Sequence, residues 1–308
     1  SPLVEMSSID EAYLDLTGFD RCYGPVFSTV DRILRQIRDT FGMELSAGIA
    51  TNKLVAKVAS KIAKPSGLLQ VFPGCERTFM APLHLEQVPG VGVHLGHRLA
   101  CLGLSTVGEL SRLELSLLVR VFGRTGEWLY NMARGQGSLR VEAERPPAKS
   151  AGHSVTFTQD TLERCFLEGI LYHLSEKVGA RVRRMGMVGR TVTLRLRYSD
   201  FKTVTRSSSV GEGTRCDQEI FETAHRLMLP LLERGVRVRL LGVTLSSLRP
   251  AEDQLDLFAE GFQNRRLRLY STVDTLREKY GFSSVRKGCA LWLENFRKPP
   301  EYTGRKAS

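Results

Sequence analysis

The chain has 308 residues, of which 42% are hydrophobic and 25% are charged, values that predict two or more globular domains and exclude a disordered chain. A formal net charge of +11 at pH 7 favours a polyanionic partner. No apolar run is long enough to span a bilayer and no signal-peptide pattern occurs, so we expect a cytoplasmic protein that does not enter a membrane.

The positive charge is concentrated in the second half of the chain. Residues 1–138 carry 14 Lys or Arg against 13 Asp or Glu, residues 139–250 carry 19 against 12, and residues 251–308 carry 11 against 8. The middle segment is therefore the best candidate for contact with a phosphate backbone. The six cysteines form no CxxC pair and no cluster with zinc-type spacing, which fits a reducing compartment.

The first 76 residues mix strands with two helices. Residues 3–17 predict a tight strand pair, and residues 26–41 predict an amphipathic helix. Residues 45–50 predict a short strand, and a helix follows from about residue 53 to residue 64, where Pro65 ends it.

The rest of the chain divides into a helical, a mixed and a terminal part. Residues 77–138 predict a compact all-helical segment, and the polar residues 139–150 predict an extended linker. Residues 151–250 show the order strand, helix, strand, strand, helix, strand, which predicts a four-stranded antiparallel sheet backed by two helices. Residues 251–308 predict a loop, then a helix over about 262–280 and a polar end. The expected fold class is α+β with several domains.

The boundaries of the individual elements in the mixed part are also predicted. The helices are expected near residues 162–185 and 215–233, and the strands near residues 152–157, 190–198, 202–209 and 238–247.

Two adjacent carboxylates, Asp10 and Glu11, occur at the predicted turn between the first two strands. At a sharp corner both can reach one ion, and oxygen ligands suit Mg²⁺, which keeps waters and phosphate oxygens in the rest of its shell. A pair of such ions can activate an attacking hydroxyl and stabilise a leaving group in phosphoryl transfer. Taken alone, an Asp-Glu pair is more often an exposed turn beside a half-buried strand, and that alternative stays open at this point.

A row of lysines, Lys53, Lys57, Lys61 and Lys64, recurs along the second predicted helix. At 100° per residue these lysines lie within about 80° of one another, with apolar residues on the opposite side. Such a row can hold phosphates as point charges, although a solvated helix face is the commoner result for lysines at this spacing.

Both segments resemble the catalytic blocks of the Y-family DNA polymerases, in particular the DinB type that includes bacterial DNA polymerase IV. The string SIDEAYLD at residues 8–15 is similar to the family's catalytic signature, and residues 46–68, ending in KPSG, are similar to its next block. The resemblance covers roughly residues 5–290. It implies a template-directed DNA polymerase for translesion synthesis and DNA repair. Such a nucleotidyltransferase uses two Mg²⁺ ions, deoxynucleoside triphosphates and primer-template DNA.

The resemblance also implies roles for individual residues. Asp10 would be a metal ligand, and Glu11 would be the second catalytic carboxylate, nearest the primer 3′ end. Lys64 of the KPSG string would contact the triphosphate of the incoming nucleotide, and Lys53 and Lys57 are candidate DNA contacts.

A glycine-containing turn at residues 88–92 lies between two apolar helical stretches. Glycines permit a tight turn whose N–H groups face a phosphate, and a helix N-terminus adds a favourable dipole. The pattern resembles the helix-hairpin-helix of the family's thumb, which would grip the DNA backbone through Gly90 and Gly92. A plain glycine-rich connector between helices is the alternative.

The mixed segment resembles the family's little-finger domain, which lies along duplex DNA. On its central predicted strand Arg195 and Arg197 alternate with apolar residues, so one face suits packing on helices and the other suits phosphates. Arg206, on the next predicted strand, is a third candidate DNA contact. An ordinary ferredoxin-like domain with a charged face shows the same pattern.

The string QLDLF follows the mixed segment and resembles the short peptide that bacterial replication proteins insert into the sliding clamp. Gln254, Leu255, Leu257 and Phe258 would be its clamp-binding anchors. The alternative is the start of a helix that packs Leu257 and Phe258 inward.

The resemblance assigns the chain to five segments. These are a partial palm (1–76), a thumb with a helix-hairpin-helix (77–138), a linker (139–150), a little finger (151–250), and a clamp-binding peptide with a helical tail (251–308).

Members of the family open with a strand that bears another metal-binding Asp, followed by a small fingers domain, and we find no counterpart of either. We therefore expect the chain to be inactive alone, with an unpaired palm edge near residues 1–20. We also expect it to be a monomer. The alternative function is a non-catalytic, polymerase-like accessory protein that binds DNA and the clamp. Such relatives lose the Asp-Glu pair, which this chain keeps as Asp10 and Glu11. A repair module built on the helix-hairpin-helix alone leaves both catalytic blocks unexplained.

Overall fold

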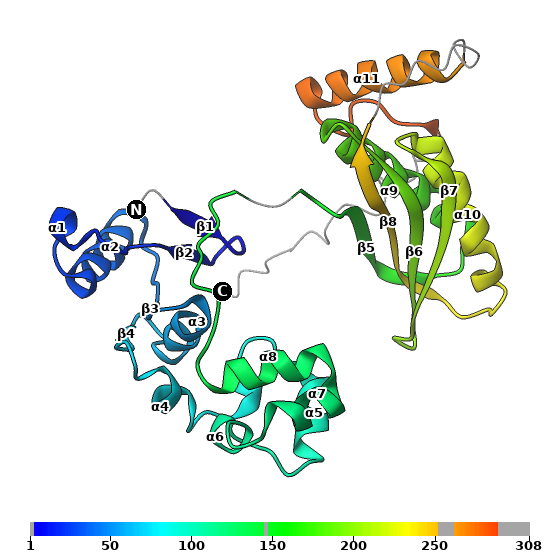
Figure 1. The fold of residues 1–308 in the computed structure, drawn as a ribbon. Helices are drawn as coiled ribbons and strands as arrows, with labels where there is room; N and C mark the ends of the chain where they lie inside the picture. Colours follow the sequence, from blue (N-terminus) through cyan, green and yellow to red (C-terminus); the bar gives the residue numbers. More distant parts are fainter. Residues whose placement is uncertain (1–2, 145–146, 252–261, 289–308) are drawn as a thin grey trace, which may run out of the picture. The chain divides into compact units, whose positions relative to one another are not determined.

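The structure is a computed structural model that describes residues 3–144, 147–251 and 262–288. It contains two compact units, Ser1–Pro146 and Pro147–Ser308 (Figure 1). The boundary falls inside the segment 139–150 that the sequence predicts to be a linker, and the segments expected to be palm and thumb share the first unit.

The first unit combines short strands with helices. Its elements are β1 (Val4–Met6), β2 (Ala12–Leu14), α1 (Asp20–Tyr23), α2 (Val26–Phe41), β3 (Ala47–Ile49), α3 (Lys53–Ile62), β4 (Leu68–Gln70), α4 (Glu76–Met80), a 3₁₀ turn (Leu85–Gln87), α5 (Val93–Ala100), α6 (Val107–Leu110), α7 (Leu115–Phe122) and α8 (Arg124–Ala133).

Local patterns in the first unit account for the bounds of its helices. The amphipathic pattern of residues 26–41 forms α2, which ends at Gly42 in the left-handed conformation. Asn52 caps α3, because its side-chain oxygen accepts a hydrogen bond from the Val55 N–H at 3.1 Å. The helix α1 and the strand β4 add to the predicted elements, and β4 pairs in parallel with β3.

The buried core of the first unit begins at α3 and continues through the helices that follow. Its fully buried side chains include those of Val55 on α3, Met80 on α4, Leu99 on α5 and Leu129 on α8. The Asn52 amide also donates to the Gly135 carbonyl oxygen at 2.8 Å, so the start of α3 is fixed to the end of the helical segment. This core gives α3 a rigid position.

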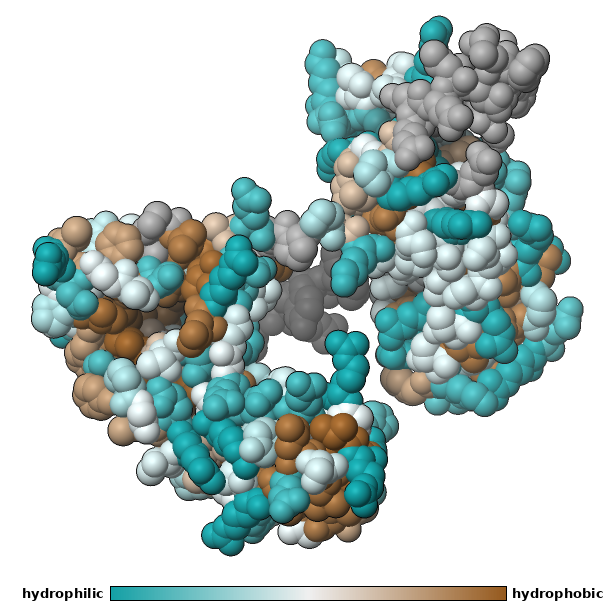
Figure 2. All heavy atoms as spheres, viewed as in Figure 1, coloured by the Kyte–Doolittle hydropathy of each residue, from teal (hydrophilic) through white to brown (hydrophobic). Residues whose placement is uncertain are grey.

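The elements before α3 leave apolar side chains exposed. Of the sixteen described residues of α2, only Thr29 is buried. Figure 2 shows hydrophobic surface over the part of the first unit that carries α1 and α2. The exposed large hydrophobic residues before α3 are Leu3, Val4, Met6, Ile9, Leu14, Tyr23, Phe27, Phe41 and Met43. A two-stranded sheet is marginal in water by itself, so this face is suited to contact with a further polypeptide segment.

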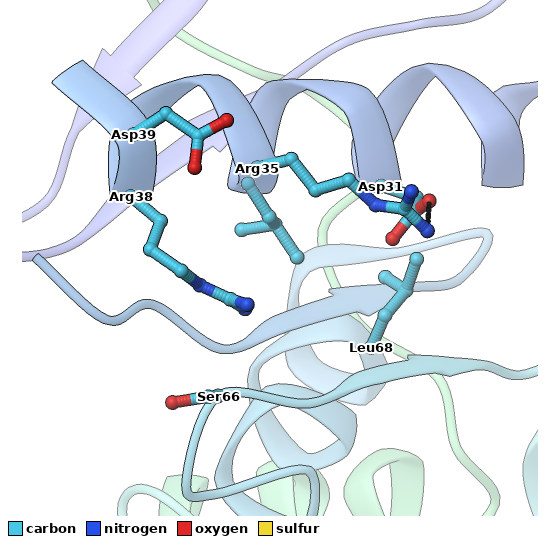
Figure 3. Close-up of a pocket in the computed structure, with 7 residues that line it drawn as sticks. Asp31, Arg35, Arg38, Asp39, Ser66 and Leu68 are labelled. Atoms are coloured by element: carbon cyan, nitrogen blue, oxygen red, sulfur yellow. Dashed lines mark ion pairs between the residues drawn. The ribbon is translucent and has the colours of Figure 1, made fainter.

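A cavity of about 450 Å³ separates α2 from β4 (Figure 3). Asp31, Arg35 and Arg38 line it from α2, and Ser66 and Leu68 line it from the opposite side. Arg35 and Asp31 form an ion pair of 2.8 Å along the helix. The cavity is not lined by Asp10 or Glu11, so it is distinct from the carboxylate turn.

The second unit has the predicted βαββαβ order. Its elements are β5 (Ser150–Thr161), α9 (Arg164–Arg184), β6 (Met187–Tyr198), β7 (Thr203–Thr214), α10 (Asp217–Leu232), β8 (Val238–Pro250) and α11 (Phe262–Tyr280). The sheet order is β5-β8-β6-β7 with antiparallel neighbours, which confirms the predicted four-stranded sheet. The helices α9 and α10 pack on one face of it and form its core.

A buried ionic cluster joins α11 to the other helices of the second unit. Arg183 on α9 binds Asp217 at 2.6 Å and Asp274 on α11 at 2.7 Å. Elsewhere on α9, Glu176 binds Arg277 of α11 at 2.7 Å. The side chains of Arg183 and Asp217 are only 9% and 2% exposed, so α11 is held by charged groups that have lost most of their water.

Candidate functional site

Asp10 and Glu11 lie in the turn that joins β1 to β2. The strands pair antiparallel, and the N–H groups of Ser7 and Ser8 both donate to the carbonyl oxygen of Glu11, at 2.9 and 3.2 Å. These bonds close a tight turn, in which adjacent side chains need not point to opposite faces as they do in a strand. Both carboxylates are exposed, so a ligand can reach them from solvent.

Hydrogen bonds and nearby lysines favour the ionised form of Asp10. The Ser8 hydroxyl donates to Asp10 Oδ1 at 2.5 Å and, together with the charges of Lys64 and Lys57, lowers the pKa of Asp10. Lys64 itself is exposed and precedes the cis peptide bond to Pro65. Asp10 is therefore an anion at neutral pH, as a metal ligand must be.

The turn faces the lysine row of α3. Lys57 Nζ lies 2.6 Å from Glu11 Oε2, and this contact raises the pKa of Lys57. The two catalytic blocks that the sequence singles out are thus adjacent, although 46 residues separate Glu11 from Lys57.

Lys53 connects the hairpin to α3 rather than facing solvent. Its Nζ lies 2.9 and 2.8 Å from the two carboxylate oxygens of Glu5 on β1, and 5.5 Å from the centre of the Tyr13 ring. The Glu142 N–H also donates to Glu5 at 2.8 Å and, ahead of Lys53, lowers the pKa of Glu5. This arrangement gives Lys53 a structural role and leaves its proposed DNA contact a prediction.

The composition of the turn suits a hard divalent cation. Across the described residues, no group of three or more His, Cys, Asp or Glu side chains is placed to hold a metal ion. Mg²⁺, however, is commonly bound by one or two carboxylates, with water and substrate phosphates as its other ligands. Asp10 and Glu11 supply two ionisable oxygen donors on an exposed corner, so they fit a cation that arrives with a nucleotide.

The two glycines of the predicted hairpin have different surroundings. Gly90 has a φ of +98°, and a Cβ added there would come within 2.7 Å of the Trp128 ring. Gly92 precedes α5, and a Cβ added there would meet no atom within 4 Å. The packing of Trp128 therefore explains Gly90, while the backbone at Gly92 remains open to a ligand.

We expect Gly90→Ala to destabilise the first unit by about 1–3 kcal/mol, because the new methyl group requires an unfavourable φ and displaces Trp128. Gly92→Ala is the matched control, with an expected change below about 1 kcal/mol. Urea unfolding followed by tryptophan fluorescence measures both. An equal loss in the two variants would contradict the role of Trp128.

One face of the sheet in the second unit is free of α9 and α10 and carries hydroxyl groups with two arginines. On β6, Val192, Leu194, Leu196 and Tyr198 are buried in the core, and the intervening residues point to the other face. Arg195 lies there between Gly242 and Thr205, and Arg197 donates to the Thr203 hydroxyl at 2.9 Å. This open face is therefore polar and carries positive charge.

The strand register separates Arg206 from Arg195 and Arg197. Arg206 on β7 is opposite Leu194, whose side chain is in the core, and directly opposed residues point to the same face of a sheet. Arg206 therefore lies on the other face of the sheet from Arg195 and Arg197, and its DNA contact stays a prediction. It lies at the sheet edge on the side of the helices, and its guanidinium donates to the neighbouring Thr205 carbonyl oxygen at 3.1 Å.

Two further predictions concern the clamp-binding peptide and the membrane. The clamp-binding anchors Gln254, Leu255, Leu257 and Phe258 lie outside the described residues. Within the ranges that the structure describes, no helix is long and apolar enough to cross a membrane.

Sequence reasoning missed two residues that position the turn. Ser8 has a local signal, because a serine hydroxyl can bond to the backbone two residues on, and here the Asp10 N–H donates to the Ser8 hydroxyl at 3.4 Å. Glu5 has none, since its partners Lys53 and Glu142 are 48 and 137 residues away.

Three family descriptions match the chain. The impB/mucB/samB family matches residues 1–61, and its C-terminal domain matches residues 148–257. The thumb domain of DNA polymerase-iota matches residues 86–137, which contain the glycine hairpin. The three matches follow the order of the carboxylate turn, the helical segment and the four-stranded sheet.

Curated relatives and a solved structure agree with these matches. DNA polymerase IV from Dehalococcoides mccartyi is 38% identical over 296 residues, covering 96% of this chain and 75% of that protein. DNA polymerase IV from Desulfatibacillum aliphaticivorans is 39% identical over 292 residues, covering 92% of this chain and 72% of that protein. The Y-family DNA polymerase chimera Dbh-Dpo4(243-245)-Dbh has a similar fold, with a TM-score of 0.67 at 23% identity, covering 81% of this chain and 72% of that one.

The carboxylate turn and the sheet domain are thus parts of a DNA-directed DNA polymerase, a nucleotidyltransferase. The chain belongs to the Y family of these enzymes, and to its DinB type. Membership implies dependence on divalent metal ions in general and the translesion class of DNA synthesis.

Proposed function

We propose that this chain supplies the carboxylate turn, the thumb and a DNA-holding sheet of a translesion polymerase that uses Mg²⁺ and deoxynucleoside triphosphates. The observation that carries the proposal is the position of Asp10 and Glu11 against the lysine row of α3, with Lys57 2.6 Å from Glu11. The direct test uses a chimera in which this chain replaces the matched residues of DNA polymerase IV from Dehalococcoides mccartyi. The chimera should extend a primer in a metal-dependent reaction.

Each residue of the site has a defined role in this proposal. Asp10 and Glu11 hold the cation, which when bound activates the primer hydroxyl and neutralises charge on the phosphates. The low pKa of Asp10 keeps that carboxylate ionised for binding. Lys64, exposed at the end of the row, attracts the triphosphate as a point charge. The backbone at Gly92 holds the DNA without reading its sequence.

The chain alone is proposed to be inactive. Two-ion chemistry needs carboxylates on both sides of the ion pair, and the turn supplies one cluster. The exposed apolar side chains of β1, β2 and α2 support a role for a further polypeptide segment that covers them.

We also propose that the chain is monomeric and that it binds a sliding clamp through Gln254, Leu255, Leu257 and Phe258. The clamp assignment is supported by the sequence string alone.

We propose that duplex DNA binds on the open face of the sheet. Replacing Arg195 and Arg197 together with Gln should weaken duplex binding and lower the slope of log K against log salt by about two, because each lost phosphate contact releases about one counterion fewer. Fluorescence anisotropy with unrelated duplex sequences, over a range of NaCl concentrations, measures both quantities.

The matched control for this experiment is Arg206→Gln, which removes a charge from the other side of the sheet. It should change the salt slope by clearly less than one. Binding that does not depend on salt would refute the electrostatic contact. An effect of Arg206→Gln as large as that of either open-face arginine would refute the assignment of the face.

A further inference from the structure

Lys57 contacts one of the two carboxylates proposed to hold the metal ion. Its Nζ contacts Glu11 Oε2 at 2.6 Å, and the side chains are 33% and 48% exposed. The ammonium group is therefore bound to one of the two carboxylates of the proposed metal site, at the side that faces α3. Asp10 lies close enough for its charge to act on Lys57 as well.

The neighbouring lysines of the row have other partners. Lys53 holds both carboxylate oxygens of Glu5, and Lys61 donates to the Gln87 carbonyl oxygen at 3.0 Å. Among these three, Lys57 is the lysine whose ammonium group contacts the Asp10–Glu11 turn. The three lysines thus have different roles, since Lys53 fixes the hairpin, Lys61 reaches the segment after α4, and Lys57 neutralises the turn.

An ammonium group and a divalent cation compete for the same carboxylate oxygen. Their repulsion weakens binding of a divalent cation by about thirtyfold when the two charges are about 4 Å apart in water-like surroundings, and by about fivefold when the ammonium group has moved to about 8 Å. The Lys57–Glu11 pair is easy to separate, because exposed ion pairs contribute little and a lysine side chain has many alternative rotamers.

We infer that Lys57 is an exchangeable counter-ion of Glu11, which holds this carboxylate until a divalent cation displaces the ammonium group. The inference rests on the proposed function, since it takes Asp10 and Glu11 as the metal ligands. Lys57 is in this sense a positioning residue, because it acts on the metal through Glu11. The positive charge of Lys57 also offsets the repulsion between the adjacent carboxylates of Asp10 and Glu11 before the metal binds.

The test is a titration of the full chain with Mn²⁺, following the electron paramagnetic resonance signal of the free ion. Lys57→Gln removes the competing charge and should raise Mn²⁺ affinity about fivefold. Lys57→Arg keeps the charge and should retain the affinity of the unaltered chain. Lys61→Gln removes the same charge from the same helix but has no contact with the turn, so its effect should stay below about twofold. Thermal unfolding of all variants shows whether the fold is kept.

Two failures can be told apart. If Asp10→Asn with Glu11→Gln leaves Mn²⁺ binding unchanged, the proposed metal site is wrong, and the inference falls with it. If those changes abolish binding but Lys57→Gln does not strengthen it, only the inference is overturned. It is also overturned if Lys61→Gln strengthens binding as much as Lys57→Gln, because the effect is then one of general charge.

Discussion

Replacing Arg183 by Met will destabilise the second unit by about 3–5 kcal/mol at pH 8, the cost of leaving a buried charge without its partner. Arg183 binds two carboxylates, those of Asp217 and Asp274, and it is 9% exposed. Asp217 is 2% exposed and has little access to water once the guanidinium is gone. The loss should be visible as a lower midpoint of chemical unfolding, because α11 also loses one of its ion pairs with α9.

The loss should shrink as the pH falls. Burial, together with the charges of Glu176 and Asp274, raises the pKa of Asp217 to about 6 against the opposing effect of Arg183. Since the folded pKa exceeds the unfolded value of about 4, the stabilising protonation is complete below about pH 4 and is lost as the pH rises through 6. Without Arg183 the pKa of Asp217 rises further. The variant should therefore be destabilised by only about 1–2 kcal/mol at pH 5.

Arg184→Met is the matched control for this prediction. Arg184 pairs with Glu278 at 3.2 Å, and the two side chains are 71% and 61% exposed. Exposed pairs contribute about 0–1 kcal/mol, so unfolding of this variant should stay close to that of the unaltered chain. A loss in Arg183→Met that does not depend on pH would show that protonation of Asp217 does not control the stability of this cluster.

The sequence could predict the helices and the order of the second unit because their signals are local. The bounds of α2 and α11 agree with the predicted ranges, and Pro65 follows α3 as expected. The parallel pairing of β3 with β4 could not be predicted in the same way. Each strand has three residues, and their partners are brought together by α3 rather than by a turn.

The face on which Arg206 lies depends on one loop. The turn between β6 and β7 is three residues long, because the Tyr198 N–H donates to the Lys202 carbonyl oxygen. Such loops place their last residue in the left-handed region, and here Phe201 has a φ of +63°. Glycine or asparagine is the usual signal for this conformation, and the sequence has neither at this point. A shift of one residue exchanges the two faces of a strand, so Arg206 could not be assigned to a face.

The site was predictable as two segments but not as one arrangement. The strings around Asp10 and Lys57 indicate the same chemistry, and only the fold shows that Glu11 and Lys57 are in contact. The anchor Glu5 was missed for the same reason, since an ion pair across 48 residues leaves no periodic signal.

A chimera in which this chain replaces the 296 matched residues of DNA polymerase IV from Dehalococcoides mccartyi should extend a primer with Mg²⁺. The chain alone should give less than about a thousandth of that rate, since an incomplete two-metal site forfeits about 4 kcal/mol of transition-state stabilisation. The unmatched part of the relative should also cover the exposed side chains of Leu14, Phe27 and Phe41. The measurement is the single-nucleotide insertion rate, with dye binding to exposed apolar surface as a second readout.

Within that chimera, Asp10→Asn should lower the insertion rate by about 10³-fold, because the amide does not replace the ionised carboxylate at the metal. Asp15→Asn makes the same chemical change on the same hairpin, where the Asp15 carboxylate accepts a hydrogen bond from the Thr17 N–H at 2.9 Å. Its insertion rate should remain within about threefold of the rate of the unaltered chimera.

Rapid synthesis by the chain alone would show that the carboxylate turn suffices without a covering segment. Full activity of Asp10→Asn would show that this carboxylate does not bind the catalytic ion.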